Sequence, residues 1–360
     1  MASTPRVLDL AGRAKRTNVD VIGTSLTEFL IGMQTFTLEE SAHTFDVGPE
    51  WFDRVRAAAG KDLSPAVHLL GSAPWGSLLA KAIVERWPDD IEGCIERVDA
   101  VEPEDLWLLF AGAHVRPLAD RVARDVFVHA ARGDRAARKH LVDEAAETFG
   151  DRERDAGTWS LSAEELHNLA VTALRGWYRD VFSNQEQHAT QVIERDVAAK
   201  ERLRRTLSDA ELIEAASNGL VYVPEPWVER IVLTPHLAMR PWNVSCAHDD
   251  TYVLCYPVAD ESIGLDQGAP PAHLVRLHKA LADEKRLRIL KLLARSDLNL
   301  QELSAAIGLG KSTTHHHTVI LRSAGLIRTS TELENRYSIR REALAEAGAA
   351  LGDFLEGETP

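Results

Sequence analysis

Three adjacent histidines, His315, His316 and His317, stand near the end of the chain in KSTTHHHTVILRSAGLI, residues 311–327. Imidazole is a common ligand of transition metals, so the triplet raises the question of a metal site. Consecutive residues of a helix point about 100° apart, and chelating histidine pairs on helices are spaced at i and i+4. If this stretch is a helix, the triplet is therefore not expected to hold a metal ion.

The residues just before the triplet suit contacts with DNA. Thr314, Thr318 and Leu321 fall on one face of the expected helix, so we expect them to pack inward. Small hydroxyls and a lysine that stay outward at a helix start can bond phosphates or base edges. The DNA contacts predicted here are Lys311, Ser312, Thr313, His315 and His316. The alternative is that Ser312 and Thr313 only cap the helix.

Two further helices are predicted before this one. HLVRLHKALADEKRLRILKLLARS, 273–296, places Leu287, Leu290 and Leu293 at steps of three, which predicts one amphipathic helix. In LNLQELSAAIGLG, 298–310, an asparagine and a glutamate three residues apart predict the cap of a short helix. That helix would bury Leu300, Leu303 and Ile307 and would end in the left-handed conformation at Gly308.

The order of the elements predicts a winged helix-turn-helix. A tight, glycine-containing link joins the second and third helices, which is typical of the helix-turn-helix motif. The strand-like segments 326–330 and 336–340 follow, separated by TELEN, 331–335, and they predict a β-wing. Arg328 and Arg336 flank this wing and are predicted to meet the DNA backbone or the minor groove. The alternative for both is a solvated surface arginine.

These segments resemble the ArsR family of winged-helix transcriptional regulators over about residues 275–340. The resemblance implies a homodimer that binds a palindromic operator in double-stranded DNA, with the third helix in the major groove. Some members bind metal through Cys-x-Cys at the second helix, where this chain has Asn299 and Gln301. Others use histidines of a C-terminal helix, and residues 341–358 contain none. Neither metal site of the family is therefore expected, and no cofactor is expected.

The charge distribution separates this region from the rest of the chain. The whole chain has a formal net charge of −14, which by itself argues against binding nucleic acid. Residues 272–340 nevertheless carry 12 Lys and Arg against 6 Asp and Glu. The remainder is strongly acidic. The pattern indicates an acidic body joined to a basic module that can follow phosphates.

The body is predicted to be mostly helical. Apolar residues at helical spacing run from about residue 25 to 218, and Ser162 with Glu165 matches a capping box. Asp249 and Asp250 lie between apolar flanks and predict a hairpin turn. Short strands are predicted at 6–10, 18–23, 220–224, 229–235 and 243–257. The expected fold class is therefore mainly α with small β parts (α+β).

Composition also predicts the domain boundaries. ADESIGLDQGAPP, 259–271, is rich in glycine, proline and acid and is the best linker candidate. It would separate an acidic domain, 1–258, from a winged helix-turn-helix domain, 272–345. Residues 346–360 would form a C-terminal tail.

The acidic body admits three interpretations. The first is a sensor for a small-molecule effector, because all eight tryptophans precede the linker and could line a pocket, although most are expected to fill the core. The second is a dimerisation or docking module, with the charge-rich stretch 160–217 as its interface. The third is an enzyme, in which His236 and His248 near Asp249 and Asp250 would form a site, although histidine and aspartate are common in loops. No GxGxxG, P-loop, HExxH or GxSxG motif supports the third.

The most probable function from the sequence is a ligand-responsive repressor that acts as a dimer and is not an enzyme. No apolar run approaches the roughly 18–20 residues needed to cross a bilayer, and the start of the chain lacks a secretion signal, so no membrane association is expected. Three widely spaced cysteines form no disulfide framework, which favours a reducing cytoplasm.

Overall fold

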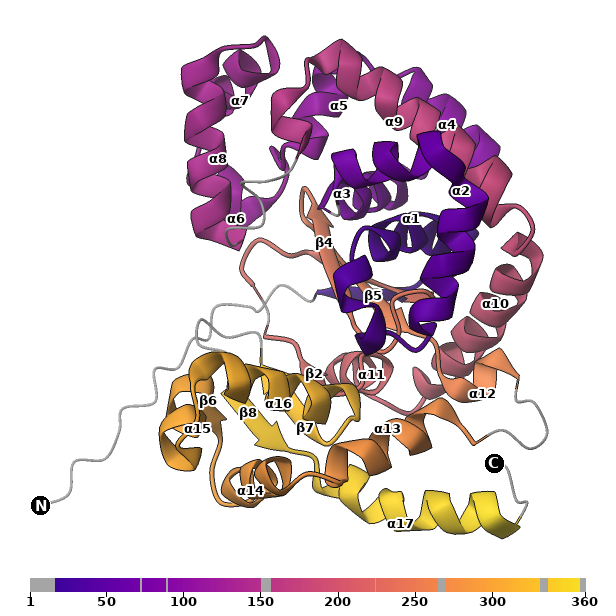
Figure 1. Cartoon of the computed structure of the whole chain (residues 1–360), viewed down its shortest axis with the longest axis vertical. Helices are drawn as coiled ribbons and strands as arrows, with labels where there is room; N and C mark the ends of the chain where they lie inside the picture. The colour runs from indigo at the N-terminus through magenta and orange to yellow at the C-terminus, as the bar shows by residue number, and fades with distance from the viewer. Residues whose placement is uncertain are drawn as a thin grey trace, which may run out of the picture.

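The structure, a computed structural model, describes residues 17–71, 73–88, 90–149, 157–223, 225–264, 270–330 and 336–356. It contains a large, mostly helical body and a smaller C-terminal module (Figure 1). The structure has two small four-stranded sheets, one within the body and one centred on the module, and helices supply most of the remaining structure. The predicted fold class, mainly α with small β parts, is confirmed.

The helices of the body surround a continuous apolar core. They are α1 (Ser25–Phe36), α2 (Gly48–Leu70), α3 (Ala73–Val84), α4 (Ile91–Asp99), α5 (Pro103–Phe110), α6 (Arg116–Ala119), α7 (Arg124–Ala131), α8 (Arg135–Phe149), α9 (Ala163–Trp177), α10 (Glu186–Leu203) and α11 (Asp209–Ala216). A short π-helical segment, Tyr178–Phe182, follows α9. Ser162 and Glu165 form the predicted capping box at the start of α9. Trp75, Trp107 and Trp177 are fully buried, as expected if most tryptophans fill the core.

The sheet of the body lies beneath these helices. Its strands are β1 (Asn18–Val21), β3 (Arg230–His236), β5 (Thr251–Pro257) and β4 (Val244–His248), in that spatial order. The first three are parallel, while β4 and β5 form an antiparallel hairpin whose turn is Asp249 and Asp250, as predicted. Helices α1 and α10 pack on β3, which explains why that strand is buried along nearly its whole length. The strand predicted at 6–10 lies outside the described residues.

The C-terminal module has the predicted order of elements. Its helices are α13 (Ala272–Leu281), α14 (Glu284–Leu293), α15 (Leu300–Ile307), α16 (Lys311–Ser323) and α17 (Arg341–Glu356). Its strands are β6 (Leu298–Asn299), β7 (Ile327–Ser330) and β8 (Arg336–Ile339), and β7 and β8 pair antiparallel as the two sides of the wing. The capping box of Asn299 and Glu302 and the left-handed Gly308 bound α15 as predicted. The wing tip, 331–335, lies outside the described residues.

The prediction of one helix over residues 273–296 is wrong. Residues 273–296 form two helices, α13 and α14, because Asp283 caps α14 by accepting a hydrogen bond from the backbone N–H of Arg286. The break changes which side chains face the core. Leu287 is 49% exposed, whereas Ile289, Leu290 and Leu293 are buried. The burial predicted from the leucine spacing is therefore wrong for Leu287.

The body and the module are joined by a shared sheet. Strand β2 (Leu220–Val221), which follows α11 of the body, pairs parallel with β7, so the sheet order is β2-β7-β8-β6. In Figure 1, β2 and α11 lie where the two parts meet. The start of the expected linker is also packed, because it contains α12 (Asp260–Ile263), in which Asp260 and Ser262 are buried. We call the boundary region around α11, β2 and α12, where the body meets the module, the joint.

The C-terminal tail of the prediction is largely helical, since α17 continues through residue 356. In the described part of the chain, no helix combines the length and the apolar character that crossing a membrane requires.

Candidate nucleic-acid interface

The start of α16 presents an open polar surface. Gly310 occupies the cap position, and Lys311, Ser312 and Thr313 are exposed in the first turn. Neither hydroxyl makes a hydrogen bond to any residue that the structure describes, so the capping alternative gains no support. The free backbone N–H groups of a first helical turn favour anions such as phosphate. This surface therefore has the chemistry that a DNA backbone requires.

The opposite face of α16 holds the helix in the module. Thr314, Thr318 and Leu321 are buried, as predicted. The two threonine hydroxyls are satisfied locally, since Thr314 donates to the carbonyl of Gly310 at 3.0 Å and Thr318 to that of His315 at 2.9 Å. The inward face fixes the rotation of the helix, and with it the residues that point outward.

The three histidines do not point toward a common centre. His315 and His316 are exposed, whereas His317 is half-buried and places its Nδ1 3.9 Å from Oδ1 of Asp283. The ring centroids of His316 and His317 are 6.1 Å apart. Burial lowers the pKa of His317. His315 and His316 thus extend the outward surface of the helix start, and His317 packs against α14.

The two wing arginines lie in different environments. Arg336 donates to the backbone carbonyl of Asp297 at 2.6 Å and remains 40% exposed at its side chain. Arg328 is paired with Glu214 of α11 in the body and lies 3.4 Å from Glu342 of α17. Arg336 is therefore at the surface of the wing, 3.7 Å from Glu302, whereas Arg328 is partly buried in ion pairs with α11 and α17.

Comparison with known proteins fits this geometry. Residues 283–329 match the family described as bacterial regulatory protein, arsR family. The C-terminal module is an ArsR-type helix-turn-helix. The chain is also 40% identical over 63 residues to the transcriptional activator HlyU of Vibrio cholerae serotype O1. That alignment covers 18% of this chain and 58% of HlyU. No solved structure matches the chain.

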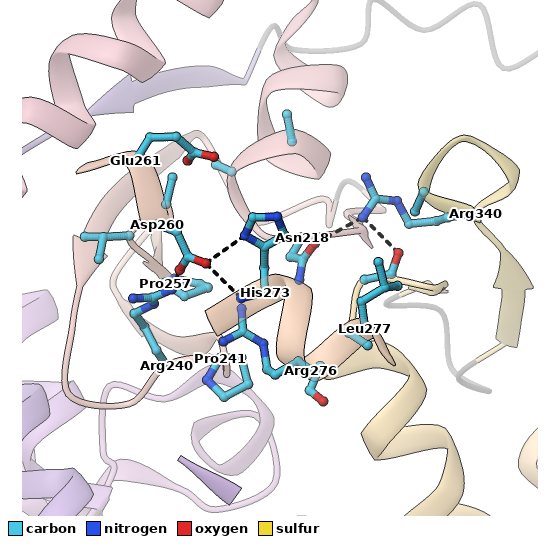
Figure 2. A pocket seen from close by; sticks show the side chains of 18 of the residues that line it. Asn218, Arg240, Pro241, Pro257, Asp260, Glu261, His273, Arg276, Leu277 and Arg340 are labelled. Atoms are coloured by element: carbon cyan, nitrogen blue, oxygen red, sulfur yellow. Dashed lines mark hydrogen bonds and ion pairs between the residues drawn. The ribbon is translucent and has the colours of Figure 1, made fainter. Parts of the chain in front are cut away.

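The ArsR-type module is tied to the body by charged side chains at the joint. Arg276 of α13 pairs with Asp46, which follows α1 in the body. Asp260 of α12 accepts hydrogen bonds from the backbone N–H and Nδ1 of His273, at 2.8 and 2.7 Å. It also pairs with the buried Arg240. Figure 2 shows Asp260 and His273 turned toward each other in this network.

Helix α16 touches the body at its C-terminal end. The guanidinium of Arg322, near the end of α16, lies 5.5 Å from the ring centroid of Trp242, within the range of a cation–π contact. Burial lowers the pKa of Arg322. The start of α16 is therefore open, while its end is packed against the acidic domain.

A cavity of about 350 Å³ lies at the joint. Both parts of the chain contribute basic side chains to its lining: Lys200 and Arg240 from the body, and His273, Arg276 and Arg340 from the module (Figure 2). Burial lowers the pKa of Arg240 to about 10, so this guanidinium still carries its charge at neutral pH. Asp260 and Glu261 line the same cavity, and Arg240 and Arg276 are paired with Asp260 and Asp46, so the lining holds charges of both signs.

The structure separates the two histidines that the sequence grouped near Asp249. His236 is fully buried, and its Nε2 lies 3.0 Å from the backbone carbonyl of Trp242. Burial lowers its pKa to about 3, so it stays neutral. His248 instead packs beside His114, whose ring centroid is 4.7 Å away. His236 pairs in register with Pro257 at one end of β5, whereas His248 pairs with Thr251 at the other end, so the structure does not bring the two predicted histidines together. His114 had no local signal to identify it.

Proposed function

We propose that this chain is a dimeric, ligand-responsive regulator of transcription that reads duplex DNA through α16 and the wing. The observation that carries this proposal is the exposed start of α16 in a module that matches the arsR family. The module, 272–345, acts as the DNA-binding domain. The body acts as the sensor and has no catalytic role. The protein works in the cytoplasm, where its DNA lies.

The DNA contacts belong to three groups in this proposal. Lys311, Ser312 and Thr313 contact phosphates and base edges from the first turn of α16, and His315 and His316 extend that contact. Arg336 meets the backbone beside the wing. Arg328 reaches DNA only if its ion pair with Glu214 opens.

Two features support the dimer in this proposal: the geometry of operator recognition and the exposed leucines of α17. Two recognition helices related by a two-fold axis read half-sites about one helical turn, roughly 10 bp, or a multiple apart. In α17, Leu351 and Leu355 are one turn apart and are 37% and 73% exposed. Apolar side chains spaced in this way suit packing against the same helix of a second copy.

The ligand response is assigned to the joint cavity. A ligand shifts an equilibrium only if it binds the two states with different affinity. A molecule held between Arg240 of the body and Arg276 of the module would sense any change in how the two parts pack. The competing interpretation, a body that only docks other proteins, predicts that no small molecule changes the affinity for DNA.

The sign of regulation is proposed to be repression, although HlyU is named an activator. The position of an operator relative to its promoter decides this sign, so occupancy of DNA is the quantity to measure.

The test begins with duplex DNA captured by the purified full-length protein from fragmented genomic DNA and then sequenced. We expect a two-fold symmetric site and an affinity that falls steeply with salt, because phosphate contacts release counterions. A gel-shift series with fractionated cell metabolites then tests the response. A monomer that binds without sequence preference would overturn the regulator proposal. A specific site with no responding fraction would support the docking interpretation instead.

A further inference from the structure

Two histidines and an aspartate meet at a place in the body that takes no part in the proposed DNA interface. His114 follows α5, His248 is the last residue of β4, and Asp249 begins the hairpin turn. One ligand atom from each side chain can be chosen so that all three lie within 4.8 Å of one another. Nδ1 of His114 is 4.0 Å from Oδ1 of Asp249, and Nε2 of His248 is 3.8 Å from Oδ2 of Asp249.

His248 is buried without the hydrogen bonds that a buried imidazole normally makes. Its exposure is 3%, and its Nδ1 has no hydrogen-bond partner among the residues that the structure describes. Buried polar atoms usually have a partner. The unpartnered atom is Nδ1, whereas the nitrogen 3.8 Å from Asp249 is Nε2, so it is the cluster of three side chains, and not this atom, that points to an ion. The rings of His114 and His248 are tilted by 31°, so the second imidazole packs on the first without bonding to it.

Both imidazoles are partly desolvated. Burial lowers the pKa of His114 and of His248, and His114 lowers that of His248 further, while the carboxylate of Asp249 acts in the opposite direction on both. Lys81 lies near both rings, but its charge is paired with Glu85, the residue that follows the end of its helix α3.

We propose that His114, His248 and Asp249 bind one divalent transition-metal ion of the Zn²⁺ type. Two imidazoles and one carboxylate are ligands that Zn²⁺ accepts, with metal–ligand distances of about 2.0–2.2 Å. Tetrahedral geometry at such distances places ligand atoms roughly 3.3 Å apart, so this cluster must contract by less than about 1.5 Å. Asp249 is the ligand free to move, because its side chain is 67% exposed at the turn.

Three protein ligands leave at least one coordination position for water or another small ligand. His114 also lines a cavity of about 440 Å³, together with Glu85, Trp87 and Arg124. This cavity provides a path by which the ion and a further ligand can reach the site. The ion would clamp the β4–β5 hairpin to the helical layer that follows α5.

The test uses the full-length protein after treatment with a chelator. Titration with Co²⁺, followed by visible absorption, and competition with Zn²⁺ should give one bound ion per chain. Asp249→Asn keeps the size of the side chain and tolerates the positive φ of 50° at this position. It should weaken Zn²⁺ binding by at least about tenfold, since even the outer partners of metal ligands matter that much. His114→Gln should weaken binding by a similar factor.

The matched control is Asp250→Asn, which removes the same charge from the neighbouring exposed residue of the same turn. Its affinity for Zn²⁺ should equal that of the unmodified chain, as should the affinity of His315→Ala in the histidine triplet. At the same concentration, Zn²⁺ should also raise the Tm of the Asp250 variant more than that of the Asp249 variant. The proposal is overturned if the chain binds no stoichiometric ion. Equal affinities of the Asp249 and Asp250 variants, or loss of the ion in His315→Ala, would overturn it as well.

Discussion

The start of α16 and the joint carry similar polar and basic side chains in opposite states. At the helix start, Lys311, Ser312 and Thr313 are exposed, and the structure gives the two hydroxyls no partner among the described residues. At the joint, Arg276 and Arg328 are paired with Asp46 and Glu214 of the body. A guanidinium in an ion pair must lose that partner before it can contact a phosphate. The basic excess of the module therefore overstates the charge that is available to DNA.

The ion pairs of the joint indicate a further role for the acidic body. Its carboxylates do more than lower the net charge of the chain, because several of them hold particular cations of the module. Coupling between sites requires contacts that differ between two states. Ion pairs at the joint link the two parts of the chain, whereas the start of α16 is exposed in the state that the structure shows.

The strongest test of the joint is Asp260→Ala. The two side chains of the Arg240–Asp260 pair are each 6% exposed, and removing one partner of a buried pair leaves the other charge uncompensated. We expect the free energy of unfolding to fall by roughly 3 kcal/mol, the lower end of the usual range, because Asp46 still lies 3.5 Å from Arg240. Urea denaturation followed by circular dichroism measures the loss.

Glu261→Ala is the control for this change, because the neighbouring acid is exposed and should alter stability by no more than about 0.5 kcal/mol. If both variants lose the same stability, the joint is held by something other than the Asp260 network.

One buried carboxylate has no cationic partner in the part of the chain that the structure describes, in contrast to the paired carboxylates of the joint. Among the described residues, Glu28 of α1 accepts hydrogen bonds from backbone N–H groups alone, those of Leu237 at 2.6 Å and Ala238 at 3.0 Å. Burial raises its pKa from 4.5 to about 7. A raised folded pKa contributes stability below about pH 4.5, and that contribution is lost as the pH rises through 7. Relative to Glu28→Gln, the chain should lose about 3 kcal/mol of unfolding free energy between pH 4.5 and pH 8.

The measurement is a series of urea denaturations of both proteins across this pH range. Glu28→Gln keeps an oxygen acceptor but cannot ionise, so it removes this one titration. A constant difference between the two proteins at all pH values would show that Glu28 ionises normally.

The local parts of the DNA-binding module could be predicted from the sequence, because their signals lie within a few residues. Asn299 and Glu302 fixed the start of α15, and Gly308 fixed its end. The bounds of α16, 311–323, and its buried face were likewise predictable. The cap at Asp283 was missed because a regular leucine spacing continued across the break.

The joint and the histidine cluster could not be predicted in this way. Strand β2 pairs with β7 from more than a hundred residues earlier, and no local pattern says which edge a two-residue strand will meet. The same holds for His114, which reaches His248 only after the hairpin packs on the helices. The counts of charged residues in the sequence predict a basic module. Which of its cations are exposed and which are paired depends on partners that are distant in the sequence. Direct contact between DNA and the residues of α16 stays a prediction.

The exposed start of α16 can be tested by substitution of its two hydroxyl residues. Ser312→Ala combined with Thr313→Ala should weaken binding to the specific site by roughly 1–3 kcal/mol if one good base contact is lost. Binding to unrelated DNA should change less, because Lys311 remains. Gel shifts on both kinds of DNA measure the difference, and circular dichroism checks that α16 is intact. The control is Ser296→Ala, which removes an exposed hydroxyl outside α16. If the double variant and this control lose the same affinity for the specific site, the two hydroxyls do not contact DNA.

The smallest expected effect tests whether Arg328 belongs to the joint or to the DNA interface. Glu214→Gln removes its partner in α11, and since the pair is partly exposed, the cost in stability should stay below about 1 kcal/mol. If the joint withholds Arg328 from DNA, the freed guanidinium can add one phosphate contact, and the dependence of log K on log salt should steepen by about 0.9. Asp209→Asn changes the net charge equally from an exposed position on α11, so it separates this local release from a general change in charge. Arg328→Ala completes the test: it should leave DNA binding unchanged if the arginine is held at the joint, whereas a slope reduced by about 1 on all sequences would place Arg328 on the DNA.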